Sequence, residues 1–302
     1  MKPVHQKRKK VVAMIEAGLG NQMFRHAACI ELARRTNRVC FHDRMSFTVL
    51  RQRSYLLHHF QGGLRTKHWN YLLSVVHLVV LLISQRVSLK LYDGFLCIFN
   101  IRCLKERPMG EYDVDFSCSE DAFKEPIVYV KNFCQNIKYL PDEITLREEF
   151  RFVTEPLERN RKLFALLMKE TAVSVHVRRS DYLQLVPESV IGIDYYRHAV
   201  AELKRQDSKV ARWIVFSDDV VWCKEHLDFI DNPVYVEGNA DTPWEDLRLM
   251  MACRHHIIAN SSFSWWGAYL GRDPKGITIA PKYWLSNKLT GDCLLKAGWQ
   301  VV

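Results

Sequence analysis

The sequence lacks the long apolar run that a membrane-spanning helix requires. A span needs about 20 consecutive apolar residues, whereas the one membrane-like stretch, residues 71–83, is short and has His77 at its centre. We expect this stretch to form a buried helix, with a helix lying on a membrane surface as the alternative. The N-terminus also lacks the apolar core of a signal peptide, because the short run after its basic residues is interrupted by Glu16.

Cysteine pairs with metal-binding spacing are absent as well. The 9 cysteines are scattered, and no C-x-x-C pattern occurs. This distribution argues against a zinc site and is typical of a protein kept in a reducing compartment, so we expect a cytoplasmic location. The one D-x-D triplet, residues 113–115, lies in a polar stretch with no strand predicted before it. We interpret it as a chance match to a metal-binding motif and expect no metal site.

Charge is moderate once the first ten residues are set aside. The formal net charge is +9, and a basic cluster at the N-terminus supplies much of it: Lys2, Lys7, Arg8, Lys9 and Lys10. The remaining mild excess suits an acidic ligand or an anionic membrane surface, and it gives little support for nucleic-acid binding. We therefore expect no nucleic-acid partner and keep peripheral contact with the inner face of the plasma membrane as an open alternative.

Strands and helices alternate along the chain, which predicts an α/β fold. In the first half, strands are predicted over 11–16, 39–42 and 128–130, and a helix over 22–36. Residues 141–169 look helical and would link the two halves. Strands in the second half recur regularly between helices, over 173–178, 213–216, 234–236, 256–259 and 277–280.

Five strands with intervening helices predict a parallel, Rossmann-like sheet in the second half. A chain of 302 residues is long for one core and comfortable for two domains. We place these domains at 1–165 and 166–302.

The most informative segment is V-S-V-H-V-R-R-S-D-Y, residues 173–182. Its alternating valines predict a strand in which His176 and Arg178 share one face. Arg179 and Asp181 follow at the carboxyl end, where open α/β sheets bind their ligands. A guanidinium stays charged and can grip two oxygens at once, so the segment predicts a phosphate or diphosphate site. A salt bridge that merely closes the strand end is the alternative.

Two further motifs follow predicted strands. In G-L-G-N-Q, Gly20 lets the backbone approach a ligand closely, and Asn21 lies ready to donate at a helix N-terminus. The motif is not a dinucleotide fingerprint, because the third glycine would fall at Met23, so a plain tight turn is the alternative. Asp218 and Asp219 could bind a metal, accept ribose hydroxyls or cap the next helix, and capping by one of them is favoured.

The segment N-S-S-F-S places Ser261 and Ser262 before Phe263 at a predicted helix start. Small hydroxyls beside free N–H groups make a diphosphate cradle, and ordinary N-capping would explain one serine. The tandem tryptophans that follow, Trp265 and Trp266, are predicted to be core.

The segment T-P-W-E, residues 242–245, reads as a capping box that satisfies free N–H groups at a helix start. Asp246 lies in the first turn of this predicted helix. Its carboxylate could pair with the N–H donors of a guanine edge, and favourable interaction with the helix dipole is the alternative.

Taken together, four motifs resemble glycosyltransferase family 11, the galactoside α-1,2-fucosyltransferases. In this order they are G-L-G-N-Q-M-F, H-V-R-R-S-D-Y, F-S-D-D-V-V-W-C-K and D-L-R-L-M-M-A-C-R-H-H-I-I-A-N-S-S-F-S-W-W-G-A-Y-L. The match runs from about residue 11 to residue 284 and is weakest over 45–165. The resemblance implies two facing Rossmann-like domains with parallel sheets, the GT-B arrangement. The first would be the acceptor side, and the second would bind GDP-L-fucose.

The resemblance also implies a reaction. L-fucose would move from GDP-L-fucose to the 2-hydroxyl of a galactoside in a surface glycan, such as a lipid-linked O-antigen repeat, with inversion at the anomeric carbon and no cofactor or essential metal. Two alternatives stay open. One is a GDP-sugar transferase that uses another hydroxyl or acceptor, and the other is a catalytically silent nucleotide-sugar-binding protein.

By motif, Arg178 would hold the diphosphate as the leaving charge develops, and His176 and Asp181 would position it and contact the nucleotide or fucose. The resemblance assigns donor binding to Gly20, Asn21, Arg179, Asp218, Asp219, Asp246, Ser261, Ser262 and Phe263. Among the departures from the family pattern, Arg25 and His26 could alter acceptor contacts. No motif identifies the general base.

Overall fold

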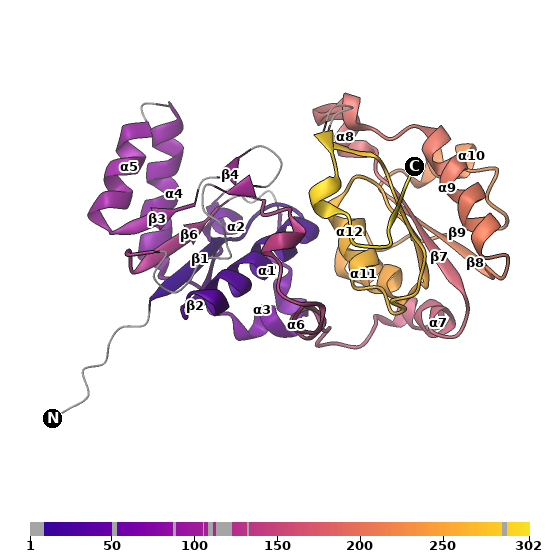
Figure 1. The fold of residues 1–302 in the computed structure, drawn as a ribbon, viewed down its shortest axis with the longest axis horizontal. Helices are drawn as coiled ribbons and strands as arrows, with labels where there is room; N and C mark the ends of the chain where they lie inside the picture. The colour runs from indigo at the N-terminus through magenta and orange to yellow at the C-terminus, as the bar shows by residue number, and fades with distance from the viewer. Residues whose placement is uncertain are drawn as a thin grey trace. The chain divides into compact units, whose positions relative to one another are not determined.

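The chain divides into two compact units, Met1–Val153 and Thr154–Val302. The computed structural model describes residues 9–49, 53–86, 89–104, 106–107, 111–112, 123–131, 133–285 and 289–302. Each unit is built on a mainly parallel sheet with helices packed against it (Figure 1).

The boundary between the units lies earlier than predicted, after Val153 rather than after residue 165. The predicted helical link is two separate helices, α6 (Glu143–Glu149) and α7 (Glu158–Leu167). α7 packs against α11 (Pro243–Ala252) of the second unit, so the chain has already left the first unit when α7 begins.

The first unit has a four-stranded parallel sheet in the order β2-β1-β6-β3. Its strands are β1 (Lys10–Met14), β2 (Val39–Asp43), β3 (Ile101–Cys103) and β6 (Ile127–Val130). Its helices besides α6 are α1 (Leu19–Arg35), α2 (Met45–Val49), α3 (Gln61–Arg65), α4 (Tyr71–Arg86) and α5 (Leu89–Ile98). Short 3-10 turns η1 (Leu57–His59) and η4 (Ile137–Tyr139) and a small antiparallel pair, β4 (Glu106–Arg107) with β5 (Glu111–Tyr112), complete it.

The apolar stretch at 71–83 forms α4, as predicted, but only one side of this helix is buried. α4 and α5 lie side by side against the sheet, over a core that includes Val12, Phe95 and Tyr129. Leu72 and Val79 face outward and are exposed. The prediction of a buried helix was therefore half right. Within the ranges that the structure describes, no helix is long and apolar enough to cross a membrane.

The second unit has a six-stranded parallel sheet in the order β14-β11-β10-β7-β8-β9. Its strands are β7 (Ala172–Val177), β8 (Arg212–Ser217), β9 (Val234–Tyr235), β10 (His255–Ile257), β11 (Thr278–Ala280) and β14 (Gln300–Val301). The five predicted strands are all present, and β14 was missed because only two residues pair with β11.

Helices alternate with the strands of this unit: α8 (Ser180–Leu185), α9 (Ile193–Gln206), α10 (Val220–His226) and α12 (Ser262–Tyr269) join α7 and α11. Two 3-10 turns, η5 (Pro187–Ser189) and η7 (Asp292–Leu294), and an antiparallel pair, β12 (Tyr283–Leu285) with β13 (Leu289–Thr290), complete it.

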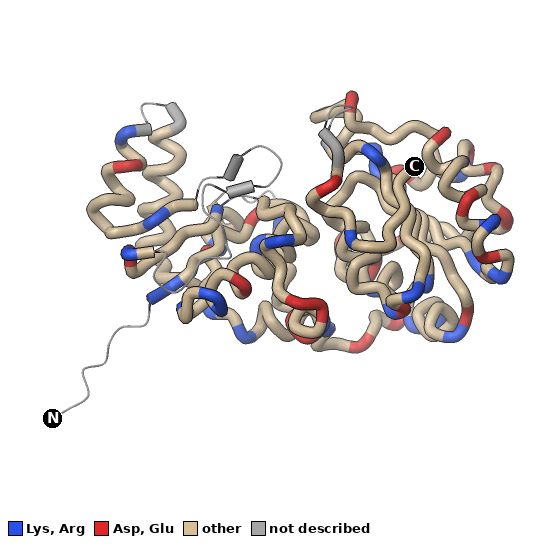
Figure 2. The backbone as a smooth tube through the Cα atoms, viewed as in Figure 1, with Lys and Arg blue, Asp and Glu red and all other residues tan. Residues whose placement is uncertain are grey.

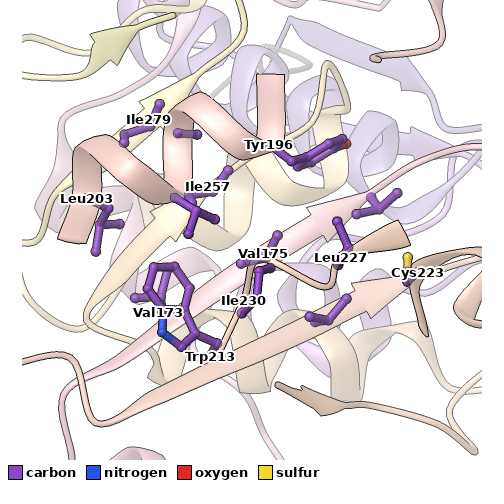
Figure 3. Close-up of a cluster of buried hydrophobic side chains, with 14 residues drawn as sticks. Val173, Val175, Tyr196, Leu203, Trp213, Cys223, Leu227, Ile230, Ile257 and Ile279 are labelled. Atoms are coloured by element: carbon purple, nitrogen blue, oxygen red, sulfur yellow. The ribbon is translucent and has the colours of Figure 1, made fainter. Parts of the chain in front are cut away.

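The predicted alternation along β7 is confirmed. Val173 and Val175 point into an apolar cluster with Trp213 of β8 and with Tyr196 and Leu203 of α9 (Figure 3). Because side chains alternate along a strand, His176 lies on the opposite face. Trp265 and Trp266 are fully buried, as expected for core residues.

Candidate functional site

Three of the predicted motifs meet at one edge of the second sheet. β7 is central and pairs in parallel with β8 on one side and β10 on the other. The carboxyl ends of parallel strands lie at the same edge, so residues 176–181, 217–219 and 260–263 follow three neighbouring strand ends. The three motifs are thereby brought to one edge of the sheet.

Arg178 is held between two carboxylates at this edge. Its Nη1 lies 3.1 Å from Asp218 Oδ2, and its Nη2 donates to Asp181 Oδ2. Asp218 also accepts the backbone N–H groups of Arg179, at 2.9 Å, and Ser180, at 3.2 Å. The strand-end salt bridge foreseen as an alternative is thus present, and it orients the guanidinium without burying it.

Arg179 stacks on an aromatic ring that the sequence analysis missed. Its guanidinium carbon lies 3.9 Å from the ring centroid of Trp222, and its Nε lies 3.4 Å from Asp219 Oδ2. Asp219 caps α10 by accepting the N–H of Trp222 at 3.1 Å, so the predicted capping role is confirmed. Trp222 belongs to the F-S-D-D-V-V-W-C-K motif, and its spacing from the capping aspartate was the available signal.

His176 is buried at the end of β7, and its ring lies 5.8 Å from that of Phe263. Burial, with the nearby charge of Arg178, lowers the pKa of His176 to about 3. The imidazole is therefore neutral near pH 7 and can act as a hydrogen-bonding group but not as a cation. Its Nδ1 is buried and has no hydrogen-bond partner within the described residues.

The N-S-S-F-S segment starts α12. The side chain of Ser261 accepts the N–H of Phe263 at 3.3 Å, so Ser261 is the N-cap. The preceding Asn260, which was not singled out, is buried and donates to the carbonyls of Ser189 and Trp284 at 2.8 and 3.0 Å. Its position directly before the two serines could have identified Asn260 from the sequence. An α-helix start with small residues offers N–H groups to an anion.

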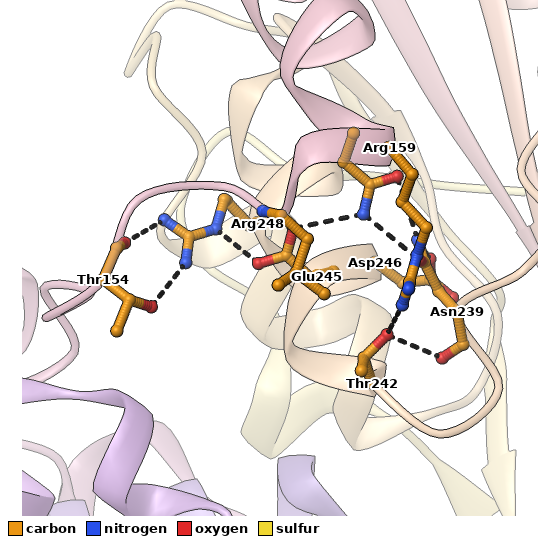
Figure 4. A network of polar contacts seen from close by, with 9 residues as sticks. Thr154, Arg159, Asn239, Thr242, Glu245, Asp246 and Arg248 are labelled. Atoms are coloured by element: carbon orange, nitrogen blue, oxygen red, sulfur yellow. Dashed lines mark hydrogen bonds and ion pairs between the residues drawn. The ribbon is translucent and has the colours of Figure 1, made fainter.

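Asp246 belongs to a separate polar network, drawn in Figure 4. Its Oδ1 accepts from Asn239 at 2.7 Å, and Asn239 in turn accepts from Arg159 Nε of α7 at 2.9 Å. Burial raises the pKa of Asp246 to about 6, against the opposing effect of the Asn239 hydrogen bond. The contacts of Asp246 and Asn239 run to α7 and α11, whereas those of Arg178 run to Asp181 and Asp218.

The predicted capping box at the start of α11 was wrong. Thr242 Oγ1 accepts from Arg159 at 2.6 Å and caps no helix N–H. The carboxylate of Glu245, fully buried, accepts from Arg248 at 3.0 Å and from the N–H of Leu157 at 2.9 Å (Figure 4). An arginine one turn later on α11 and a backbone N–H before α7 bind this carboxylate in place of the local cap, because a buried carboxylate requires several strong donors.

In the first unit, the G-L-G-N-Q motif forms the start of α1. The helix begins at Leu19, earlier than predicted, with Gly18 as N-cap, so that Gly20 and Asn21 lie in the first turn. The side chain of Asn21 accepts from Gln135 Nε2 at 2.8 Å. The residue before the cap, Ala17, takes a left-handed conformation with φ of 66°, which is strained for an L-residue.

Gln22 is the residue of this motif that sequence reasoning missed. It is fully buried and its Nε2 donates to the carbonyl of Ser54, while its Oε1 accepts the N–H of Leu56, both at 2.9 Å. The motif and the loop around residue 55 are thereby fixed to one another.

Arg25 and His26, expected to alter acceptor contacts, are instead internal. Arg25 donates to the carbonyl of Met14 at 2.7 Å and to Glu16 at 2.8 Å. His26 is buried between His42 and Glu149. Both side chains are buried, so any effect on acceptor contacts would act through the residues that they hold in place.

Within the described ranges, no group of three or more His, Cys, Asp or Glu residues is arranged to hold a metal ion. The D-x-D triplet at 113–115 lies outside those ranges. Positive charge at the site comes instead from Arg178 and Arg179.

Known proteins resemble this chain in sequence and in fold. A family model described as Glycosyl transferase family 11 matches residues 111–302. An alpha-1,2-colitosyltransferase of Escherichia coli is 31% identical over 295 residues, which span 92% of this chain and 93% of that protein. The galactoside alpha-(1,2)-fucosyltransferase 1 of Homo sapiens is 36% identical over 105 residues, 33% of this chain and 29% of that protein.

Among solved structures, the NodZ alpha-1,6-fucosyltransferase soaked with GDP-fucose has a TM-score of 0.55 at 17% identity, and the match covers 90% of this chain and 95% of that chain. At this identity the likeness shows the fold alone. Together with the two parallel sheets, it confirms the α/β, GT-B-like fold class that the sequence predicted.

Proposed function

Because this chain belongs to glycosyl transferase family 11, we propose that it moves L-fucose from GDP-L-fucose to the 2-hydroxyl of a galactoside in a surface glycan. Membership makes it a glycosyltransferase of the fucosyltransferase type. The donor, the linkage and the acceptor are the proposal. The observation that carries it is Arg178, oriented by Asp181 and Asp218 at the carboxyl end of β7 within the family motif.

The proposed reaction breaks the bond between the fucose anomeric carbon and the diphosphate oxygen, and GDP leaves with the electron pair. The acceptor 2-hydroxyl oxygen bonds to the opposite face of that carbon and gives up its proton. Negative charge therefore develops on the diphosphate, where a preorganised cation lowers the barrier most. Arg178 is placed for this role, and Arg179 and the N-terminus of α12 add to the positive field. With two arginines present we propose that no metal is required.

The remaining site residues are proposed to bind different parts of the donor or to hold the loops that do so. His176 stays assigned to the donor by its motif and by its place at the carboxyl end of β7. The half-buried carboxylate of Asp246 suits the two N–H donors of a guanine edge. Asp218 and Asp219 act through the loops that carry the arginines, because both are engaged with backbone N–H groups. Gly20 and Asn21 stay assigned to the donor by resemblance.

A second donor is favoured by one observation. The colitosyltransferase of Escherichia coli matches nearly the whole chain, and colitose is fucose without its 3-hydroxyl. A site that hydrogen-bonds this hydroxyl would reject colitose by roughly 10⁴-fold, whereas an apolar contact there would discriminate only weakly. Competition between GDP-fucose and GDP-colitose for turnover decides between the two.

The proposed function is tested first by calorimetric titration with GDP, GDP-fucose, GDP-mannose and UDP-galactose, with and without EDTA. We expect GDP to bind at micromolar concentration, EDTA to have no effect, and the uridine nucleotide not to bind. A chain that binds no GDP would be a catalytically altered family member, and the proposal would fail.

Turnover then tests the role of Arg178. We expect Arg178→Ala to lower kcat by on the order of 10²–10³-fold, as the loss of a charge-stabilising donor does. The matched control is Arg205→Ala, which removes an exposed arginine of α9 whose guanidinium donates to Glu202 of the same helix. If fucosyl transfer by Arg178→Ala equals that of Arg205→Ala, the assigned role of Arg178 is wrong.

A further inference from the structure

Helix α4 is apolar on its outward side as well as towards the core. Leu78 is buried in the core of the first unit beside Ser74 and His77, whereas Leu72, Val79 and Ile83 on the outward side are exposed. His77 is accommodated inside by a hydrogen bond of 2.8 Å between its Nε2 and the hydroxyl of Tyr92. A helix at a water-facing surface normally places its apolar residues inward. The outward side of α4 is therefore suited to an apolar neighbour.

Helix α5, which packs against α4, continues this apolar surface. Exposed apolar residues of the two helices form what we term the hairpin face: Leu72, Val79, Leu82, Ile83, Leu91, Ile98 and Phe99. Ile98 is 79% exposed and Leu72 is 70% exposed. Single exposed apolar residues are ordinary, whereas a group of them on two helices that pack together is typical of an interaction surface. Figure 2 shows these two helices with few charged positions.

The charges near the hairpin face are mostly positive. Asp93 is the one acidic residue between residues 71 and 99, and Lys90 is exposed at the start of α5. Lys10 begins β1, and its Nζ lies 5.0 Å from the ring of Trp69, directly before α4. The basic N-terminal segment, with Lys2, Lys7 and Arg8, is thus joined to the fold beside the first turn of α4.

We propose that the hairpin face rests on an anionic lipid membrane, with α4 and α5 in the plane of the headgroups and the basic N-terminal segment on acidic lipids. Apolar burial and attraction to acidic headgroups together give the two signals that stable peripheral binding requires. A second copy of the chain is the weaker occupant, because two basic segments would then be brought together. The inference goes beyond the proposed function, since it involves neither donor nor acceptor.

Flotation of the full-length protein with vesicles tests the proposal. We expect it to float with vesicles of equal parts phosphatidylcholine and phosphatidylglycerol, and to float poorly with phosphatidylcholine alone. The variant Leu72→Gln/Val79→Gln/Ile83→Gln should lose binding by on the order of tenfold or more. The matched control, Leu64→Gln/Ile144→Gln, changes exposed apolar residues of α3 and α6 and should float as the wild type does.

The charge contribution has its own variant. Removing residues 2–8 should weaken binding to the acidic vesicles by about fivefold for each Lys or Arg lost and should flatten its dependence on salt. GDP binding and thermal unfolding, measured on every variant, separate loss of fold from loss of docking. A wild type that ignores GDP yet floats would overturn the proposed function and leave this inference standing.

Cys97 supplies an independent readout, because it is exposed on α5 while the other cysteines of the described ranges are buried or half-buried. Cys118 lies outside those ranges and is replaced by serine. A polarity-sensitive dye on Cys97 should shift to shorter wavelength with acidic vesicles. No flotation, unchanged flotation of the triple variant, or a dye that stays in water would each overturn the proposal. The proposal would also be overturned if the wild type formed a dimer, the triple variant were monomeric, and the wild type did not bind lipid.

Discussion

The two carboxylates that hold Arg178 are anchored very differently. Asp218 accepts two backbone N–H groups besides the guanidinium, so it is part of the loop that shapes the site. Asp181 is bonded to Arg178 alone, and its Oδ1 is buried without a partner in the described structure. An incoming diphosphate can therefore displace Asp181 from the guanidinium at little cost, whereas displacing Asp218 would also release the loop.

This difference predicts opposite effects of two isosteric substitutions. Asp181→Asn removes a negative charge beside the diphosphate, and we expect GDP to bind about fivefold more tightly, equal to ~1 kcal/mol of relieved repulsion. Asp218→Asn presents an amide to backbone N–H groups, so GDP affinity should fall by on the order of tenfold. Calorimetry on both variants measures the two changes, and equal losses would show that Asp181 is as structural as Asp218.

Asp246 predicts a pH dependence of nucleotide binding. Its pKa of about 6 means that the carboxylate accepts guanine N–H groups at pH 8 and is largely protonated at pH 5. GDP affinity should therefore fall as the pH drops below about 6. The terminal phosphate of GDP titrates in the same range, so the profile of Asp246→Asn is the control. An identical pH profile in that variant would remove Asp246 from the guanine site.

The same raised pKa has a consequence for stability. The folded state binds this proton more tightly than the unfolded state does, so the stabilisation is complete at pH values below the ordinary pKa of an aspartate. It is lost as the pH rises to about 6 and above. Asp246→Asn should accordingly raise the Tm at pH 8 and leave it unchanged at pH 4. A lower Tm at pH 8 would show that the charge stabilises the fold.

At the scale of the elements, a buried chain of hydrogen bonds joins α1, β2 and α6 of the first unit. His26 Nε2 contacts Glu149 at 3.1 Å, His26 Nδ1 contacts His42 Nε2 at 2.9 Å, and His42 Nδ1 contacts Tyr55 at 2.9 Å. When Glu149 is ionised and both imidazoles are neutral, each group can donate to the next, from Tyr55 towards Glu149. Burial keeps the pKa of His42 well below its usual value, which suits a neutral ring in this chain.

Breaking this chain at its centre should destabilise the first unit. His26→Leu leaves the buried N–H of His42 without an acceptor, and we expect the free energy of unfolding to fall by about 1–3 kcal/mol. Glu149→Gln retains an oxygen that accepts from His26 and should lose less. Urea unfolding of the full chain measures both, and a greater loss in Glu149→Gln would locate the stabilisation in the Arg65 ion pair instead.

Most elements could be predicted from local sequence patterns, because the polarity of their residues matches their burial. The valines of β7 alternate and are buried, and α1 and α10 begin at glycine and aspartate caps that are visible in the sequence. Prediction failed where a partner distant in sequence decided the outcome. β14 is too short to show a period, and the outward side of α4 has the composition of a core helix.

The same reasoning explains which site residues were found. Charged and small residues directly after strands, such as Arg178 and Ser261, are visible without a structure. Trp222, Asn260 and Gln22 act through partners elsewhere in the fold, namely Arg179, Ser189 and the loop at Ser54. These three residues belong to no periodic pattern, and their residue types alone predict no contact. Glu245 was assigned a local cap for the same reason, because its buried partners lie in the segment around α7.

At the scale of the whole molecule, similarity to the family is concentrated in the second unit. The family match at 111–302 includes all of Thr154–Val302, and the site around Arg178 lies within it. The first unit contributes the G-L-G-N-Q motif and the hairpin face. It also contains most of residues 45–165, the region in which the resemblance is weakest. We therefore expect donor chemistry to be set mainly by the second unit, and differences in acceptor and docking to arise in the first.

The net positive charge of the whole chain predicts weak binding of polyanions. The first ten residues hold five of the cations behind the formal charge of +9, and a short basic segment attracts any polyanion at low salt. We expect weak binding of duplex DNA at low ionic strength that disappears near physiological salt. Removing residues 2–8 should abolish it, because β1 begins only at Lys10 and the fold is left intact. Fluorescence anisotropy measures this. DNA binding that persists in the shortened chain would place a nucleic-acid surface on the folded units and would contradict the expectation of no nucleic-acid partner.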